Sequence, residues 1–366
     1  MFRTLKSTAY WALVVSNGVA IILMFLVGNI DKLSPVEHPL LSNIPLGFPL
    51  LLALNLGFLV LWTVVRFRMV WLPIVGLLLC YGSIRIYTPF NLTAKHPAKS
   101  LKVLTYNVFL FNTWDYLDSK ENPILRYILD SKADIVCLQE TQAYYEGGAG
   151  IYDTLKAAYP YSDNIRTWQT GDQHMMFLSK YKILKKERIK YASQGNISMA
   201  YIINYNGREV LVVNNHFESN HLSEEDKHEY KRMITKPFEG DAVKKESFSL
   251  LHKLGEASKV RAPQVDAVTS YVKKYRERNV PVILCGDFND NPLSYTRRKI
   301  AEQLTDCYIK TGNGPGFSYH KSGMFVRIDN IFCSDEFEPF EAKVDNKVNA
   351  SDHYPLLTWL KYRPKP

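Results

Sequence analysis

The sequence predicts an α/β domain that follows an N-terminal membrane region. The first indication is a change of composition near residue 95, where long uncharged runs give way to charged sequence. The second is that short apolar runs of strand character then alternate with stretches of helical periodicity, a pattern typical of α/β domains. At 366 residues the chain is also too long for one average domain. We therefore assign residues 1–95 to the membrane region and residues 100–366 to the α/β domain.

The charge of the chain does not point to one class of partner. Residues 1–98 carry seven Lys or Arg and two Asp or Glu, a net charge of +5, so residues 99–366 contribute 9 − 5 = +4. Basic residues beside membrane spans have their own explanation, so the high overall charge is weak evidence for nucleic-acid binding. The five cysteines have no spacing typical of zinc sites or disulfide frameworks, and we expect buried thiols.

Three membrane spans are expected, over residues 8–28, 45–65 and 69–88. No charged residue occurs in the 24 positions between Lys6 and Asp31, which exceeds the roughly 20 residues needed to cross a bilayer. A second uncharged run ends at Val65. The third run has only 16 residues before Arg85, so a buried core helix is an alternative to a span that ends with a snorkelling arginine.

Basic residues near the expected spans predict the orientation of the chain. Because cytoplasmic loops are enriched in Lys and Arg, the residues at the start and in the second loop place the N-terminus inside. These residues are Arg3, Lys6, Arg66 and Arg68, against Lys32 alone in the first loop. Lys95, Lys99 and Lys102 argue the other way, but they begin a long domain, which translocates largely regardless of charge. We expect an integral membrane protein, of the inner membrane if the source is bacterial, with its large domain on the extracytoplasmic side.

The first two strands expected in the α/β domain end in polar side chains. Residues 101–108 alternate as a strand does and end near Asn107, and a helical stretch follows at residues 124–131. Residues 134–141 read as a buried strand with Glu140 at its exit. A carboxylate in this position is either solvated in the next turn or directed into a site, and for one residue taken alone the turn is the simpler interpretation.

A hairpin and a charged segment occupy the middle of the domain. Strand-like pieces at residues 175–179 and 183–191 precede Asn206-Gly207, the strongest short-range hairpin signal, and the second hairpin strand runs into His216. Residues 218–259 are highly charged and read as a helical insertion, which either caps the substrate site or is a solvated surface elaboration. A further helix is expected over residues 262–278.

The stretch from residue 280 to Pro292 is the centre of the expected site. Residues 280–285 read as a buried strand, which breaks abruptly into Gly286, Asp287 and Asn289. Polar groups at the end of a buried strand lie where ligands usually bind. The same residue types are those that turns prefer, so a plain turn is the alternative.

Further candidates lie toward the C-terminus. After a helical stretch at residues 294–304, residues 326–333 read as a strand with Asp329 in its middle, where an aspartate is costly unless it is paired. Asp352 and His353 precede the last expected strand, residues 356–360. Taken together, the polar strand ends have the residue types that metal-assisted hydrolysis of phosphate esters needs: oxygen ligands for Mg²⁺, groups that contact phosphate oxygens, and a base for water.

Six short motifs follow one another over residues 101–361: Thr-Tyr-Asn, Leu-Gln-Glu-Thr, Asn-Asn-His, Gly-Asp-Phe-Asn, Arg-Ile-Asp-Asn-Ile-Phe and Ser-Asp-His-Tyr-Pro. In type and order they resemble the motifs of the endonuclease/exonuclease/phosphatase superfamily, which includes deoxyribonuclease I-like and neutral sphingomyelinase-like enzymes. Each motif is weak alone, whereas all six in sequence are specific. The resemblance implies a four-layered α/β sandwich, with two packed mixed β-sheets flanked by helices and the site at one end.

The resemblance also implies roles for eight residues. Asn107, Glu140 and Asp352 look like metal-site residues, with Glu140 the principal Mg²⁺ ligand and Mn²⁺ as an alternative ion. His216 resembles a histidine that donates to the scissile phosphate, and Asp287 resembles the group that positions or deprotonates water. Asn289 would bind a phosphate oxygen, and His353 would be a catalytic histidine oriented by Asp329.

The expected function is therefore a membrane-anchored, Mg²⁺-dependent phosphoesterase that hydrolyses a phosphodiester or phosphomonoester by attack of water. A lipid headgroup is one expected substrate because anchoring brings the site near the bilayer surface. The alternatives are a nuclease and a non-catalytic member that binds phosphate ligands. A nuclease should have a long basic groove, and the net charge of the domain does not decide between these.

Overall fold

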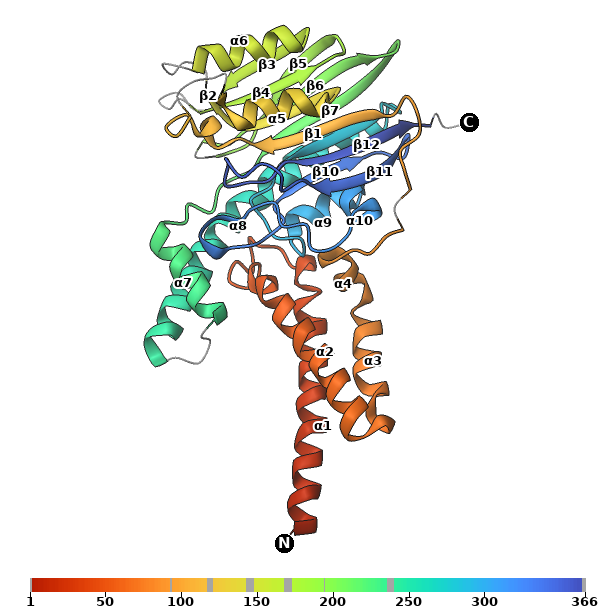
Figure 1. The fold of residues 1–366 in the computed structure, drawn as a ribbon, viewed down its shortest axis with the longest axis vertical. Helices are drawn as coiled ribbons and strands as arrows, with labels where there is room; N and C mark the ends of the chain where they lie inside the picture. Colours follow the sequence, from red (N-terminus) through yellow and green to blue (C-terminus); the bar gives the residue numbers. More distant parts are fainter. Residues whose placement is uncertain are drawn as a thin grey trace.

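The computed structural model describes residues 2–92, 94–116, 121–142, 148–167, 173–193, 195–235 and 240–363. Three elements extend away from a two-sheet sandwich on one side, as Figure 1 shows. They are helix α1 (Phe2–Val27), helix α2 (Phe48–Val65), and the pair α3 (Trp71–Leu79) and α4 (Tyr81–Tyr87). Two helices are long and apolar enough to cross a membrane, at Thr8–Lys32 and Ile44–Val65, and a third span exists if α3 and α4, bent by 63°, count as one.

Two six-stranded mixed sheets form the centre of the sandwich. In each sheet one central pair, β1 with β2 or β7 with β8, is parallel and the remaining pairs are antiparallel. The first sheet has the order β11-β12-β1-β2-β4-β3, with β1 Leu101–Asn107, β2 Ile135–Gln142, β3 Tyr161–Arg166, β4 Gln173–Ser179, β11 Phe337–Val344 and β12 Leu356–Tyr362. The second has the order β5-β6-β7-β8-β10-β9, with β5 Ile183–Ile189, β6 Ser198–Tyr205, β7 Arg208–His216, β8 Val282–Asp287, β9 Thr305–Asp306 and β10 Asp329–Cys333.

Helices cover the outer faces of both sheets, which makes four layers and confirms the expected α/β sandwich. A buried cluster packs α5 (Pro123–Ser131) and α6 (Gly148–Ala158) on the first sheet. Another packs α8 (Gly240–Arg276) and α9 (Tyr295–Ala301) on the second. Helix α7 (Glu224–Thr235) pairs with the start of α8 beside the sandwich, and α10 (Cys307–Thr311) lies near β11.

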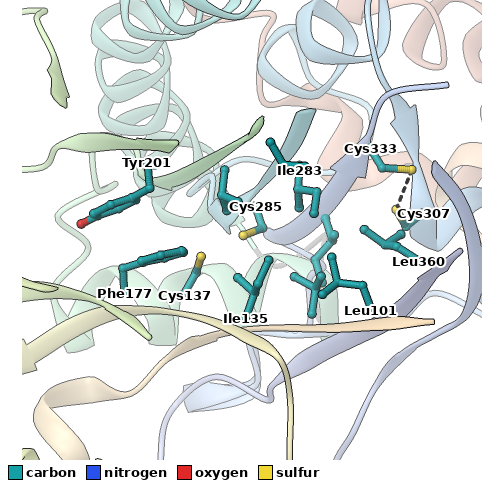
Figure 2. Close-up of a cluster of buried hydrophobic side chains, with 14 of the residues drawn as sticks. Leu101, Ile135, Cys137, Phe177, Tyr201, Ile283, Cys285, Cys307, Cys333 and Leu360 are labelled. Carbon is teal, nitrogen blue, oxygen red and sulfur yellow. Dashed lines mark hydrogen bonds between the residues drawn. The ribbon is translucent and has the colours of Figure 1, made fainter. Parts of the chain in front are cut away.

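The core between the sheets is apolar and contains the cysteines expected to be buried. Phe177 of the first sheet stacks on Tyr201 of the second with a centroid separation of 4.1 Å, and Cys137 and Cys285 lie nearby (Figure 2). All five cysteines are free and buried, as the sequence predicts. The Cys307 and Cys333 sulfur atoms are 3.7 Å apart and form a hydrogen bond, not a disulfide.

Two expectations about the elements are wrong. The sequence suggests a separate helix from residue 262, but α8 runs unbroken through Pro263. Proline resembles a helix start because it lacks an N–H. Here the helix continues because the residues after Pro263, among them Val265, Val268 and Val272, pack on the second sheet. Asp329 does not lie in the middle of a strand, because β10 begins at Asp329 and the preceding residues form a loop that bridges Tyr319 and Val326.

The apolar helices are joined to the sandwich by a buried contact surface. Leu293 of the sandwich packs with Met24, Val27, Phe48 and Cys80 of the helices. The fully buried Arg327 donates hydrogen bonds to the carbonyls of Ile86 and Tyr87 at the end of α4. Because helix C-terminal carbonyls lack partners within the helix, this guanidinium satisfies groups that would otherwise be buried unpaired.

Candidate active site

Polar side chains from both sheets meet at one end of the sandwich. In the second sheet, Asp287 on β8 is the register partner of His216 on β7 and of Asp329 on β10. Asn107 ends β1 of the first sheet, and Glu140 lies on β2 at a register shift between Leu138 and Thr141. The carboxyl ends of the parallel pairs β1–β2 and β7–β8 therefore bring these residues together, which no single strand end predicts.

Unusual backbone conformations fix the orientation of the site residues. Glu140 and Asn289 have φ angles of 50° and 52°, in the left-handed region that residues with a Cβ seldom adopt. Gly286 has a φ of 136°, and a Cβ added there would lie 1.9 Å from the carbonyl oxygen of Asn215. Only glycine fits this position. The absence of a side chain at Gly286 allows β7 and β8 to approach each other closely just before Asp287.

Asn107 holds the two central carboxylates of the site together. Its Nδ2 donates to Glu140 Oε1 and to Asp287 Oδ2, both at 3.0 Å, while its Oδ1 accepts from the N–H of Phe109. The amide therefore bridges the two sheets. In this arrangement it positions carboxylate oxygens and does not itself turn an oxygen toward them.

Two histidines flank Asp287. His216 Nε2 lies 3.6 Å from Glu140 Oε1 and 3.7 Å from Asp287 Oδ2, and it has no hydrogen-bond partner among the described residues. His353 Nε2 lies 3.8 Å from Asp287 Oδ2, and its Nδ1 is 2.8 Å from Asp329 Oδ2. The expected pairing of Asp329 with His353 is thus present in the geometry.

Burial and neighbouring charges shift the pKa values of these groups in different directions. Burial raises the pKa of Asp287 to about 6, although both histidines oppose the shift. Burial alone would lower the pKa of His353, but the carboxylates of Asp329 and Asp287 outweigh it and raise that pKa to about 10. Burial lowers the pKa of His216 and raises that of Glu140. At neutral pH, His353 is cationic and His216 is neutral.

The donor set fits a divalent cation. The ligand atoms of Glu140, His216 and Asp287 lie within 4.8 Å of one another, and so do those of Asp287, Asp329 and His353. No lysine or arginine in the described part of the chain forms an ion pair with Glu140 or Asp287. A buried carboxylate and a partly exposed one that share the Asn107 amide and have no fixed cation beside them are an environment in which a hard metal ion binds.

The structure places the remaining two predicted residues at the edge of this cluster. Asn289 lines the pocket, and its Nδ2 donates one hydrogen to the carbonyl of Phe217 at 3.0 Å. Asp352 lines the same pocket and contributes to raising the pKa of Glu140, but its carboxylate is not in either metal-ligand group. All eight predicted residues therefore meet at one end of the sandwich.

A pocket of about 200 Å³ opens above the cluster, and sequence reasoning missed most of its wall. The insertion after His216 contributes Asn220, His221 and Lys227, and the loop before β10 contributes Tyr319 and Met324. The sequence leaves open whether the insertion caps the site or is solvated, and it does not indicate which face of α7 turns toward the site. The first part of the insertion is thus part of the pocket wall, not a solvated elaboration.

Buried polar groups support the pocket from below. The guanidinium of Arg261 donates to the carbonyl of Glu218 and to Asn220 Oδ1, and Asn220 Nδ2 donates to the carbonyl of Asn289. On the far side of Arg261, Ser258 Oγ accepts from both Arg261 and Asn43, which lies in the loop between α1 and α2. Ser318 Oγ accepts from the backbone of Asp329 and so fixes the start of β10.

Most of the α/β domain matches a known protein family. A family model described as the Endonuclease/Exonuclease/phosphatase family matches residues 104–353, which is more than half of the chain. The chain belongs to this family. Its members are metal-dependent enzymes that hydrolyse phosphate esters, and the chain is an enzyme of this kind. A second model, described as a domain of unknown function, matches residues 10–87.

Solved structures agree with the family at the level of the fold. The catalytic domain of human Nocturnin with bound sulfate is 16% identical, with a TM-score of 0.53, and the match covers 74% of this chain and 96% of that one. An endonuclease/exonuclease/phosphatase from Beutenbergia cavernae is 19% identical, with a TM-score of 0.52 and 72% of each chain covered. A search of curated proteins found no match. The Endonuclease/Exonuclease/phosphatase fold thus holds the cluster described above.

Proposed function

We propose that the chain is a membrane-anchored phosphoesterase that hydrolyses a phosphate ester at the bilayer surface by attack of water. The observation that carries this proposal is the convergence of Glu140, Asp287, His216 and His353 at one end of a domain that is seated directly on apolar helices. Neighbouring buried carboxylates and histidines whose pKa values are shifted in different directions are typical of catalytic sites.

The protonation states give each residue a role in the reaction. Asp287, ionised above pH about 6, accepts a proton from the attacking water. His353 is held as a cation by Asp329 and Asp287, so it donates a hydrogen bond to the phosphate as negative charge develops. His216 Nε2 and the second Nδ2 hydrogen of Asn289 are the remaining donors to phosphate oxygens.

The proposed metal ligand is Glu140, with Asn107 and Asp352 beside it, and Asp287 keeps the role of the base. Mg²⁺ is the proposed ion, with Mn²⁺ as the alternative, because the donors are mainly carboxylate oxygens. When bound, the ion supplies positive charge next to the phosphate. Asn107 holds Glu140 beside the base Asp287, and the burial that raises the pKa of Glu140 strengthens its preference for a cationic partner.

The arrangement of the helices supports anchoring by three crossings. The loop between α1 and α2 contacts the sandwich through Asn43, and the chain returns to the sandwich after α4. If α1 and α2 each cross the bilayer, α3 and α4 must return the chain to the same side. The N-terminus then lies on the opposite face, and the distribution of basic residues makes that face the cytoplasmic one.

A lipid headgroup is the substrate class that the pocket favours over nucleic acid. Lys227 is the one lysine that lines the pocket in the described part of the chain, and no arginine does. Nucleic-acid binding depends on several cations that contact successive phosphates. A single lysine, which also pairs with Glu224 at 2.8 Å, does not provide such a row of cations.

The test uses the full chain in lipid nanodiscs, with phospholipid and sphingolipid in one set of reactions and plasmid DNA in another. We expect Mg²⁺-dependent hydrolysis of lipid phosphate esters, abolition by a chelator, and a loss on the order of 10²–10⁴-fold in Glu140→Gln and His353→Asn. Glu338→Gln, far from the site on β11, is the matched control and should retain wild-type activity.

Two outcomes would contradict the proposal. If the protein hydrolysed DNA but no lipid, the proposed lipid substrate would be wrong, whereas the proposed phosphoesterase chemistry would stand. Absence of hydrolysis of every phosphate ester, with Mg²⁺ or Mn²⁺, would remove the proposed activity itself.

A further inference from the structure

A second pocket, largely apolar and about 300 Å³ in volume, lies between the membrane helices and the sandwich. One wall is formed by residues at and before the start of α2, including Pro45, Leu46 and Leu50. The other is formed by residues of the loop before β10: Phe317, Phe325 and Val326. None of these residues has a role in the chemistry described above.

The apolar pocket adjoins the catalytic pocket. Val326 lines both. Leu46, from the membrane side, packs in a cluster with Met324, Leu222 and Tyr319, all three of which line the catalytic pocket. Packed apolar side chains therefore lie between the start of α2 and the site of hydrolysis.

The apolar pocket is open to the surroundings where a bilayer would meet the sandwich. The side chain of Leu50 is 50% exposed and that of Phe325 is 54% exposed. Leu50 lies in the first turn of a helix that is long and apolar enough to cross a membrane. A large apolar side chain exposed beside such a helix would be removed from water by a bilayer at this level.

We propose that this pocket binds a hydrocarbon chain of an amphiphilic phosphate ester, whose phosphate lies in the catalytic pocket. The inference rests on the proposed function and adds the substrate class: a lipid recognised by its chain as well as by its phosphate. A chain that leaves the bilayer beside Leu50 then lies against apolar side chains on its way to the catalytic pocket. Each buried methylene then contributes to binding in proportion to its area.

The test measures how the rate depends on chain length. Full-length protein in nanodiscs is given alkyl phosphates and alkyl p-nitrophenyl phosphates with chains from methyl to dodecyl, below their micelle concentrations. We expect kcat/KM to rise with chain length, by up to about fourfold for each methylene that the pocket buries, and then to level off.

Variants separate the pocket from the bilayer. Each substrate partitions into the disc to the same extent for all variants. A difference between variants in how kcat/KM rises with chain length is therefore due to the pocket. Phe325→Ser and Leu50→Ser should lower the dodecyl-to-methyl ratio of kcat/KM by at least about tenfold. Leu56→Ser is the matched control, because Leu56 is 44% exposed on another face of α2 and does not line the pocket.

The outcomes distinguish this inference from the proposed function. Hydrolysis of short and long esters at equal rates, or a chain-length dependence that both pocket variants retain, would overturn the inference and leave the phosphoesterase intact. A pocket filled by a second copy of the chain would give the same flat dependence together with a dimer that Phe325→Ser dissociates. Failure to hydrolyse any ester would overturn the proposed function itself.

Discussion

Two histidines beside the same carboxylate are held in opposite charge states. His216 and His353 lie at nearly the same distance, 3.7 and 3.8 Å, from the same oxygen of Asp287. The difference is Asp329, which bonds His353 Nδ1 and helps to raise its pKa to about 10, whereas burial lowers the pKa of His216. The carboxylate of Asp329 thus keeps His353 protonated, whereas His216, at nearly the same distance from Asp287, is neutral.

This difference predicts the pH dependence of the reaction. Activity should fall below pH about 6 as Asp287 is protonated and above pH about 10 as His353 loses its proton. Asp329→Asn removes the charge that keeps His353 protonated, so the alkaline limb should move down toward pH about 6.5 and kcat should fall on the order of 10²–10⁴-fold. The measurement is the pH profile of kcat/KM for wild type and variant.

Asp345→Asn is the control for this prediction, because Asp345 is a buried aspartate that accepts from Tyr127 away from the site. Its pH profile should match that of the wild type. An alkaline limb that stays in place in Asp329→Asn would show that Asp329 does not set the protonation of His353.

The β8 strand and its exit are the element on which the site depends most. β8 is buried along its whole length and pairs with β7 on one side and β10 on the other. The chain can turn Asp287 into the pocket only because Gly286 lets the Asn215 carbonyl approach. The stability of the sheet and the position of the proposed base therefore have one structural cause.

Gly286→Ala should consequently be among the most damaging single substitutions. The added Cβ would lie 1.9 Å from the Asn215 oxygen, so we expect the free energy of unfolding to fall by more than about 4 kcal/mol, or the protein not to fold. Gly207→Ala, also at positive φ but with no atom within 4 Å, should cost only roughly 1–2 kcal/mol. Thermal unfolding in detergent gives the comparison, and similar losses in both variants would contradict it.

The sequence predicts the elements whose apolar residues form a regular pattern because one or both faces of the element are buried. β1, β2, β8 and the β6–β7 hairpin contain apolar runs, and Asn206 and Gly207 adopt the positive φ angles that the turn requires. The two edge strands of the first sheet, β3 and β11, were not expected from the sequence. Both are half-exposed and mix charged and polar residues with apolar ones, so they carry no clear period.

The same contrast holds for the site. The catalytic cluster lies at strand ends, where a polar residue after an apolar run is visible in the sequence, and family motifs identify it further. Lys227, Tyr319 and Arg261 come from a helix, a loop and a long helix that meet only through tertiary packing. No local pattern indicates which face of such an element turns toward a pocket.

At the scale of the whole molecule, the membrane helices and the sandwich share buried residues. Asn43 reaches Ser258 and, through it, Arg261 beneath the pocket, while Leu293 packs among the helices. The loop between α1 and α2 must therefore lie on the same side of the proposed membrane as the active site, whereas the loop between α2 and α3 lies at the far end of the helices (Figure 1).

Labelling of introduced cysteines tests this topology. All five native cysteines are buried, so the wild type should react little with a membrane-impermeant maleimide. Glu37→Cys, exposed in the loop between α1 and α2, should react in intact cells, and Arg68→Cys, exposed between α2 and α3, only after permeabilisation. The reverse pattern would place the sandwich in the cytoplasm, and reaction of both in intact cells would contradict two crossings.

The contact between Arg327 and the end of α4 has a kinetic consequence. Because the guanidinium is buried against the carbonyls of Ile86 and Tyr87, the height of the pocket above the proposed bilayer is set by packing and not by a tether. Encounter with substrate then becomes a two-dimensional search within one leaflet. The relevant concentration is the mole fraction of substrate in the membrane, so dilution with inert lipid should slow turnover while dilution with buffer leaves it unchanged.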